Sequence, residues 1–153
     1  MSKPFSKSLY DTNDGAKYIV IDYLIEQGYK AWVNPDQYGI DVLAEKDLQS
    51  YEFEVEVKHN WNGFSFPFDE VHFAARKLKV AKNSPTNFFV MLNHQKTRGL
   101  MVNGKDFLES NIVTKSTIYT ANEKFVEVPI SKVTFFKTPI MNKEQHLLES
   151  KNG

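Results

Sequence analysis

The sequence predicts an α/β domain, in the broad sense that includes α+β, with a central mixed sheet flanked by helices. Three stretches carry this prediction, namely residues 16–24, 52–58 and 87–93. The first repeats apolar side chains at the helical period, the second alternates charged and apolar side chains, and the third is almost continuously apolar. With 153 residues the chain is long enough to bury one sizeable core. We therefore expect a single domain over residues 1–153.

The first half of the chain is expected to form one helix and three strands. Residues 1–10 are a lead-in, and residues 11–14 offer several helix N-caps. One apolar helix face is formed by Ala16, Ile19, Val20, Tyr23 and Leu24. Gly28 is expected to end this helix as a C-cap. Strands are then expected at residues 29–33, 40–44 and 52–57, with a loop at 34–39 and a polar turn at 46–50.

The second half is expected to contain mostly strands. An aromatic loop at residues 62–68 leads into a helix that begins at Val71 or Ala74 and ends at Lys82. Further strands are expected at residues 87–93, 99–102, 113–119, 124–128 and 132–137, with one or two helical turns at 104–110. The polar tail, residues 142–153, is expected to be a frayed helix or disordered.

Composition excludes several classes of protein. The chain has no cysteine, so disulfides and thiolate metal sites are excluded. No apolar run approaches membrane-spanning length, and the first residues lack the apolar segment of a signal peptide. We therefore expect a soluble, intracellular protein in the cytoplasm, without a membrane partner.

The zero net charge conceals an uneven distribution along the chain. Residues 1–57 hold 5 basic and 11 acidic side chains, whereas residues 58–83 hold 5 basic and 2 acidic ones. An acidic pocket beside a basic rim suits a cation-assisted reaction on a phosphate backbone. Unevenly scattered surface charge explains the same counts equally well.

The stretch Glu52–Trp61 is the most unusual part of the sequence. Its apolar residues Phe53, Val55 and Val57 alternate with charged ones, so one strand face carries Glu52, Glu54, Glu56 and Lys58. Like charges in a row repel one another, which indicates that something positive, most naturally a metal ion, belongs on that face. A second acidic residue, Asp41, interrupts the apolar strand just upstream.

Asp41 followed by Glu56-Val57-Lys58 resembles the PD-(D/E)XK nuclease superfamily, which has the restriction-endonuclease-like fold. The core of that superfamily is an αβββαβ unit with metal ligands on two adjacent strands of a hairpin. The elements expected in residues 11–93 follow this order, and the strands of residues 98–138 are an elaboration. Residues 54–61 and 66–77 resemble, more weakly, small resolvase-type or phage-encoded nuclease domains.

The resemblance implies a divalent-metal-dependent endonuclease that hydrolyses phosphodiester bonds in DNA. Asp41, Glu56 and the main-chain carbonyl of Val57 would hold Mg²⁺, with Mn²⁺ as a substitute. Lys58 would orient the attacking water or neutralise charge developing on the phosphate. Resolvase-type relatives act on branched DNA as dimers, so the resemblance also implies structured DNA and a homodimer. A phage-encoded protein would act in the host cytoplasm.

Two further carboxylates compete for places in the predicted site. Glu54 lies on the same strand face as Glu56. It is either a second metal ligand or, in the interpretation we prefer, a solvated neighbour nearer the start of the strand. Asp36 follows Pro35 and so completes the letters PD, but it falls in a predicted loop. Asp41 is preferred because it opens a strand, as the aspartate of the superfamily does.

One position departs from the resolvase-like pattern. Many such relatives carry a glutamate on the first helix, and the corresponding position here is Lys17, which cannot bind a cation. Asp14, Asp22 or Glu26 could substitute, and Asp14, at the helix start, is nearest to the usual ligand position. Without this ligand the site would hold one metal ion instead of two, or be catalytically weak.

The basic residues and the aromatic residues that follow the predicted strand 52–57 each have two interpretations. Arg76, Lys77, Lys79 and Lys82 either contact backbone phosphates or form a solvated helix face, and His59 and His72 are further candidate phosphate contacts. The rings of residues 62–68 either cap the core, which we prefer, or stack on bases. Two hypotheses follow: a metal-dependent DNA endonuclease, or a nuclease-fold protein that serves in nucleic-acid binding or protein assembly.

Overall fold

The computed structural model describes residues 15–36, 39–84, 86–118 and 121–139. The predictions for residues 1–14, including Asp14 and the N-cap, and for the tail at 142–153 lie outside these ranges. The elements in chain order are α2 (Gly15–Glu26), β1 (Lys30–Val33), β2 (Val42–Lys46), β3 (Gln49–Val57), β4 (Glu70–Ala74), η1 (Ala75–Lys77), α3 (Leu78–Asn83), β5 (Asn87–Leu92), β6 (Arg98–Asn103), α4 (Gly104–Glu109), β7 (Asn111–Lys115), β8 (Glu123–Pro129), η2 (Ile130–Lys132) and β9 (Thr134–Lys137).

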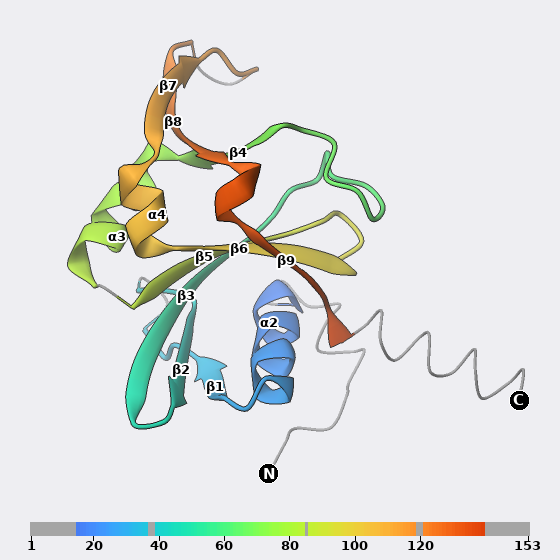
Figure 1. Ribbon diagram of the computed structural model, residues 1–153, viewed down its shortest axis with the longest axis vertical. Helices are drawn as coiled ribbons and strands as arrows, with labels where there is room; N and C mark the ends of the chain where they lie inside the picture. Colours follow the sequence, from blue (N-terminus) through green and yellow to red (C-terminus); the bar gives the residue numbers. More distant parts are fainter. Residues whose placement is uncertain (1–14, 37–38, 85, 119–120, 140–153) are drawn as a thin grey trace, which may run out of the picture.

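The fold is α+β and contains two sheets (Figure 1). The larger sheet has six strands in the order β1-β2-β3-β5-β6-β9. It is mixed, because β3 and β5 run parallel while the other neighbours run antiparallel. The smaller sheet has the order β4-β8-β7 and is antiparallel. The predicted mixed sheet with helices is thereby confirmed.

Two hydrophobic cores cover the two faces of the larger sheet. On one face α2 packs Ile19, Val20 and Leu24 against Phe53 of β3 and Val90 of β5. On the other face the second core joins the larger sheet to α3, α4 and the smaller sheet, through Phe89, Leu100, Ala81, Phe107 and Val126. Figure 1 shows α2 on one side of the sheet and α3, α4, β7 and β8 on the other. Neighbouring residues of β5, such as Phe89 and Val90, therefore enter different cores.

Glycine ends the first helix as predicted. Gly28 has a φ of 94°, the left-handed conformation that favours glycine after a helix. Tyr29 then donates its backbone N–H to the carbonyl of Leu24 over 2.9 Å. This tight exit turns the chain directly into β1, so that α2 lies back across the first three strands.

One of the two predicted starts of the second helix is wrong. Residues 70–74 form the strand β4, which excludes a start at Val71, whereas a start near Ala74 agrees with η1, which begins at Ala75 and is followed by α3. Val71 and Phe73, two residues apart, are both buried against the second core. Because β4 pairs with β8, more than fifty positions along the chain (Val71↔Val128), a strand is favoured at a place where the local sequence only weakly indicates one. The strand at β7 also starts earlier than predicted, at Asn111.

Candidate functional site

The β2–β3 hairpin determines where the acidic side chains lie. Val42 pairs with Phe53, and both are buried in the core beneath α2. Asp41, one residue before Val42, therefore lies opposite Glu54, one residue after Phe53. The carboxylate of Asp41 accepts a 2.8 Å hydrogen bond from the backbone N–H of Val55. Asp41 is thus held firmly against β3, beside the strand face that carries Glu54 and Glu56.

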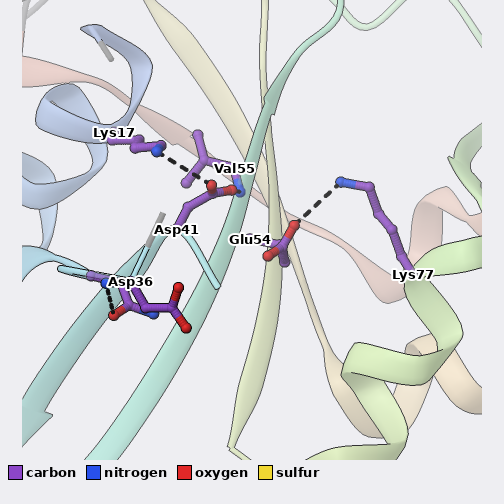
Figure 2. A network of polar contacts seen from close by, with 7 residues as sticks. Lys17, Asp36, Asp41, Glu54, Val55 and Lys77 are labelled. Carbon is purple, nitrogen blue, oxygen red and sulfur yellow. Dashed lines mark hydrogen bonds and ion pairs between the residues drawn. The ribbon is translucent and has the colours of Figure 1, made fainter. Parts of the chain in front are cut away.

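Two lysines from other elements reach these carboxylates. Lys17 of α2 places Nζ 3.6 Å from Oδ1 of Asp41. Lys77, the last residue of η1, places Nζ 3.7 Å from Oε2 of Glu54 and 3.9 Å from Oε1 of Glu56. Figure 2 shows Lys17 and Lys77 approaching the acidic strand from opposite sides. The side chain of Lys77 is only 12% exposed, so this ion pair is largely shielded from water.

Burial raises the pKa of Glu56 above its usual value. The positive charges of Lys77, Lys58 and Arg76 oppose this rise, and the negative charge of Asp41 adds to it. One carboxylate oxygen, Oε1, is buried and accepts no hydrogen bond from any residue that the structure describes. A buried carboxylate oxygen without a hydrogen bond is costly, and perturbed carboxylates of this kind cluster at functional sites.

The environment of Glu54 is similar. Its pKa is raised first by burial and then by the charge of Asp41, while Lys77 acts in the opposite direction. The side chain is 18% exposed, so Glu54 is not the solvated neighbour that the sequence suggested. Its place opposite Asp41 makes Glu54 part of the site, which we call the acidic face: Asp41, Glu54 and Glu56.

Lys58 follows β3 directly and lies next to the acidic face. Burial lowers its pKa below the usual value, Lys115 lowers it further, and Glu56 opposes the change. Its ammonium group lies 5.0 Å from the centroid of the Phe68 ring, within cation–π range. Lys58 is therefore a partly desolvated cation between the carboxylate of Glu56 and an aromatic loop.

The other residues predicted for the site are placed as follows. Asp36 is exposed in the loop between β1 and β2, where its N–H donates to Oδ1 of Asn34, and Figure 2 shows it apart from the β3 contact of Asp41. Val57 packs its side chain on the α2 core and pairs with Leu92 of β5. Lys17 does occupy the helix position that faces the site, but it brings an ammonium group to the place where a carboxylate is expected.

The predicted basic group divides into two sets. Arg76, Lys79 and Lys82 are exposed, as a phosphate-contacting surface requires. Lys77 instead turns inward onto the acidic face. His59 is exposed after Lys58, and its Nδ1 lies 3.2 Å from Nδ1 of His94.

A second group of metal-ligand residues lies on the smaller sheet. Glu70, His72 and Glu127 each offer a ligand atom, and these atoms all lie within 4.8 Å of one another. Nε2 of His72 is 2.9 Å from Oε2 of Glu127, its cross-strand neighbour. We call this group the small-sheet cluster. Sequence reasoning missed it because residues 70–74 were not predicted as a strand, and only the β4–β8 pairing brings Glu127 beside His72.

Comparison with protein-family models and with curated proteins finds no match for this chain. Within the described ranges, none of the helices has the length and apolar character needed to span a membrane. The function of the acidic face is therefore argued from its own geometry and electrostatics.

Proposed function

We propose that the protein is a Mg²⁺-dependent endonuclease of the PD-(D/E)XK type that cleaves DNA. The order of elements supports this proposal. The helix α2 is followed by the antiparallel strands β1, β2 and β3, and the chain then passes through α3 before β5 pairs in parallel with β3. Apart from the additional strand β4, this is the αβββαβ order of that superfamily.

The observation that carries the proposal is the state of Glu56. Its Oε1 is buried, accepts no hydrogen bond from the described residues, and belongs to a carboxylate whose pKa is raised by burial. Two more carboxylates, those of Asp41 and Glu54, lie close enough to influence its charge or that of one another. This arrangement costs stability, which Lys77 at 3.9 Å from Oε1 offsets in part and which a bound divalent cation would offset further.

The chemistry of the donor set suits a hard divalent cation, although among the described residues it is the small-sheet cluster, and not the acidic face, whose ligand atoms all lie within 4.8 Å of one another. Asp41, Glu54 and Glu56 offer carboxylate oxygens, the ligands that Mg²⁺ and its substitute Mn²⁺ prefer. When bound, the ion would supply Lewis acidity toward a phosphate oxygen and lower the pKa of a water ligand. Glu54 enters this set because of its place opposite Asp41, in addition to the residues that the sequence motif indicates.

Lys58 and the exposed basic residues have separate tasks in this proposal. Lys58, partly desolvated beside Glu56, stabilises negative charge that develops on the scissile phosphate, because a fixed cation acts most strongly where water is excluded. Arg76, Lys79 and Lys82 contact backbone phosphates and position the DNA without reading its sequence.

Cleavage of supercoiled plasmid and of branched DNA with Mg²⁺ or Mn²⁺ tests the proposal. Wild type should cut at least one of these substrates, whereas Glu56→Gln and Lys58→Met should not. Methionine keeps the aliphatic stem of Lys58 against Phe68 and removes only the charge. Circular dichroism must show that both variants fold. Equal cleavage by the wild type and both variants would overturn the assignment of the site.

The ion pair between Lys17 and Asp41 favours a second candidate function. A lysine at this position supplies positive charge from within the chain, which weakens the need for a metal ion. In this case the protein binds nucleic acid or assembles with other proteins without cutting DNA. DNA binding by the wild type together with no cleavage of any substrate would support this alternative.

A further inference from the structure

The aromatic loop after β3 forms a hollow in the surface. It has a volume of about 350 Å³, within the range of small-ligand pockets. The residues that line it are Phe64, Ser65, Phe66, Phe68, Arg98, Ile130 and Phe135. Three of the rings remain exposed, Phe64 by 56%, Phe68 by 42% and Phe135 by 43%. Only part of the loop therefore caps the core, and the remaining rings present apolar faces to solvent.

The rings are held in place from below. Trp61 is fully buried and makes edge contacts with Phe66 at 5.1 Å and with Phe135 at 6.3 Å between ring centroids. Phe66 in turn contacts Phe68 at 5.6 Å. A stacking surface whose rings are already ordered loses little conformational entropy when a ligand binds.

Two cations border the hollow. The guanidinium group of Arg98 lies 4.6 Å from the centroid of Phe64, and its Nε is buried without a hydrogen-bond partner in the described part of the chain. Lys58 lies over Phe68 from the direction of the acidic face. An occupant that suits exposed rings and two cations is flat, aromatic and negatively charged, and a nucleotide has all three properties.

The contact between Phe68 and Lys58 links the hollow to the candidate active site. Phe68 lines the hollow and also contacts Lys58. Lys58 directly follows β3, two residues beyond Glu56, and continues the pairing with β5 through a hydrogen bond from its backbone N–H to the carbonyl of Leu92. Residues two apart on a strand project from the same face at a separation of about 7 Å, which is close to the spacing of successive phosphates in an extended single strand. A strand bound at the acidic face can therefore place a neighbouring nucleotide in the hollow.

We propose that this hollow takes an unpaired base of the nucleic-acid substrate, stacked on Phe64, Phe68 or Phe135, with its phosphate toward Arg98 and Lys58. The inference rests on the proposed function, because it takes the substrate to be DNA. It adds that this DNA has unpaired nucleotides, as in single strands, flaps or branch points. A base within an intact duplex cannot offer both of its faces to the rings, so duplex DNA binds more weakly at this place.

Fluorescence anisotropy in buffer with EDTA tests the inference independently of cleavage. The probes are a short labelled oligothymidylate, an abasic strand of the same length and charge, and a duplex. Wild type should bind the oligothymidylate about tenfold more tightly than the abasic strand, because only the oligothymidylate has bases and one or two of them stack on the rings. Phe64→Ala and Arg98→Lys should remove most of this preference. Leu48→Ala, a fully exposed apolar residue at the far turn of the hairpin, is the matched control and should change nothing.

Two results would overturn the inference. Equal affinity for the oligothymidylate and the abasic strand would show that binding is purely electrostatic and would leave the hollow to an apolar peptide or a second copy of the chain. Unchanged preference in Phe64→Ala, with Leu48→Ala as reference, would place base stacking elsewhere. The proposed function fails separately, because a protein that binds unpaired bases but cuts no DNA retains the stacking preference and lacks only cleavage.

Discussion

The acidic face and the small-sheet cluster use similar side chains, but the charges of the two groups are compensated in different ways. In the acidic face, burial raises the pKa of Glu54 and Glu56, and lysines from other elements compensate the charge. In the small-sheet cluster the groups compensate one another: a hydrogen bond to Glu127 raises the pKa of Glu70, and hydrogen bonds with Glu70 and His72 lower that of Glu127.

This difference separates the two groups as functional candidates. The ligand atoms of the small-sheet cluster already lie within 4.8 Å of one another, so its geometry is the better one for a cation as it stands. The polar groups of this cluster, however, form hydrogen bonds with one another, so the cluster costs the fold little stability. The acidic face includes a buried oxygen that lacks such a bond, and this cost is what marks it as a site. Four predictions test this distinction.

The largest expected effect is the loss of cleavage in Glu56→Gln. The amide keeps the size of the side chain but cannot supply a carboxylate to a cation, so we expect the cleavage rate to fall at least about a hundredfold. The same change removes a carboxylate that has one buried oxygen without a hydrogen bond, so the unfolding free energy should stay the same or increase. The rate is measured on the best plasmid or branched substrate, and the stability by urea denaturation.

Glu127→Gln is the matched control, because it makes the same chemical change in the small-sheet cluster. It should leave cleavage within about twofold of wild type, since Glu127 lies outside the proposed machinery. If cleavage is lost in Glu127→Gln and retained in Glu56→Gln, the comparison is reversed and the small-sheet cluster is the site.

The second effect concerns Lys77, which compensates two carboxylates at once. Lys77→Met leaves Glu54 and Glu56 without their nearest positive charge, and we expect a loss of about 1–2 kcal/mol in unfolding free energy after allowing for partial exposure. Lys79→Met, on the exposed side of α3, should cost less than about 0.5 kcal/mol. Equal losses in the two variants would show that Lys77 is only a surface lysine.

The contrast between the two groups also shows which features a sequence can reveal. The alternation of Phe53, Val55 and Val57 with glutamates is local, and the strand it predicts is present as β3. Asp41 is recognisable for the same reason, because it interrupts an apolar run. The strand β4 was not predicted, since its burial depends on β8, which lies far along the chain.

Which residues belong to the site depends on the register of the strands and on the conformation of the connecting turns, and local sequence patterns do not specify either of these. Glu54 belongs to the acidic face because the turn at Asp47 and Leu48 sets Val42 opposite Phe53. A count from that turn would have identified Glu54. No comparable count identifies Lys77, because the 3₁₀ turn of η1 directs it inward while Arg76, its neighbour, stays exposed.

The third effect is a change in metal affinity when Lys17 is replaced. Its ammonium group repels a cation at Asp41, so Lys17→Met should bind Mn²⁺ about three- to tenfold more tightly, as measured by isothermal titration calorimetry. The fold should become slightly less stable, because Asp41 loses an ion-pair partner. Lys30→Met, an exposed lysine of β1, is the control for the change in net charge. Tighter binding in both variants would mean that net charge, and not Lys17, determines the affinity.

The smallest effect is a difference in the pH dependence of stability, which has opposite signs in the two groups. Glu54 and Glu56 have raised pKa values in the folded protein, so the folded state holds extra protons between the ordinary value of 4.5 and the raised values. Their contribution to stability therefore declines as the pH rises through that window. Glu127 has a lowered pKa, so its contribution is present above 4.5 and is lost as the pH falls through the lowered value, with Glu70 opposing it.

Urea denaturation at a series of pH values between about 3 and 8 separates these contributions by residue. Glu56→Gln should reduce the decline of the unfolding free energy above pH 4.5, and the decline that is left in this variant should come from Glu54. Glu127→Gln should change the acidic end of the profile and also remove the opposing contribution of Glu70 just above 4.5, and both changes should be small because these side chains are partly exposed and water screens their charges. If Glu56→Gln leaves the profile above 4.5 unchanged, then Glu56 is not strained by burial, and the physical argument that distinguishes the acidic face from the small-sheet cluster is lost.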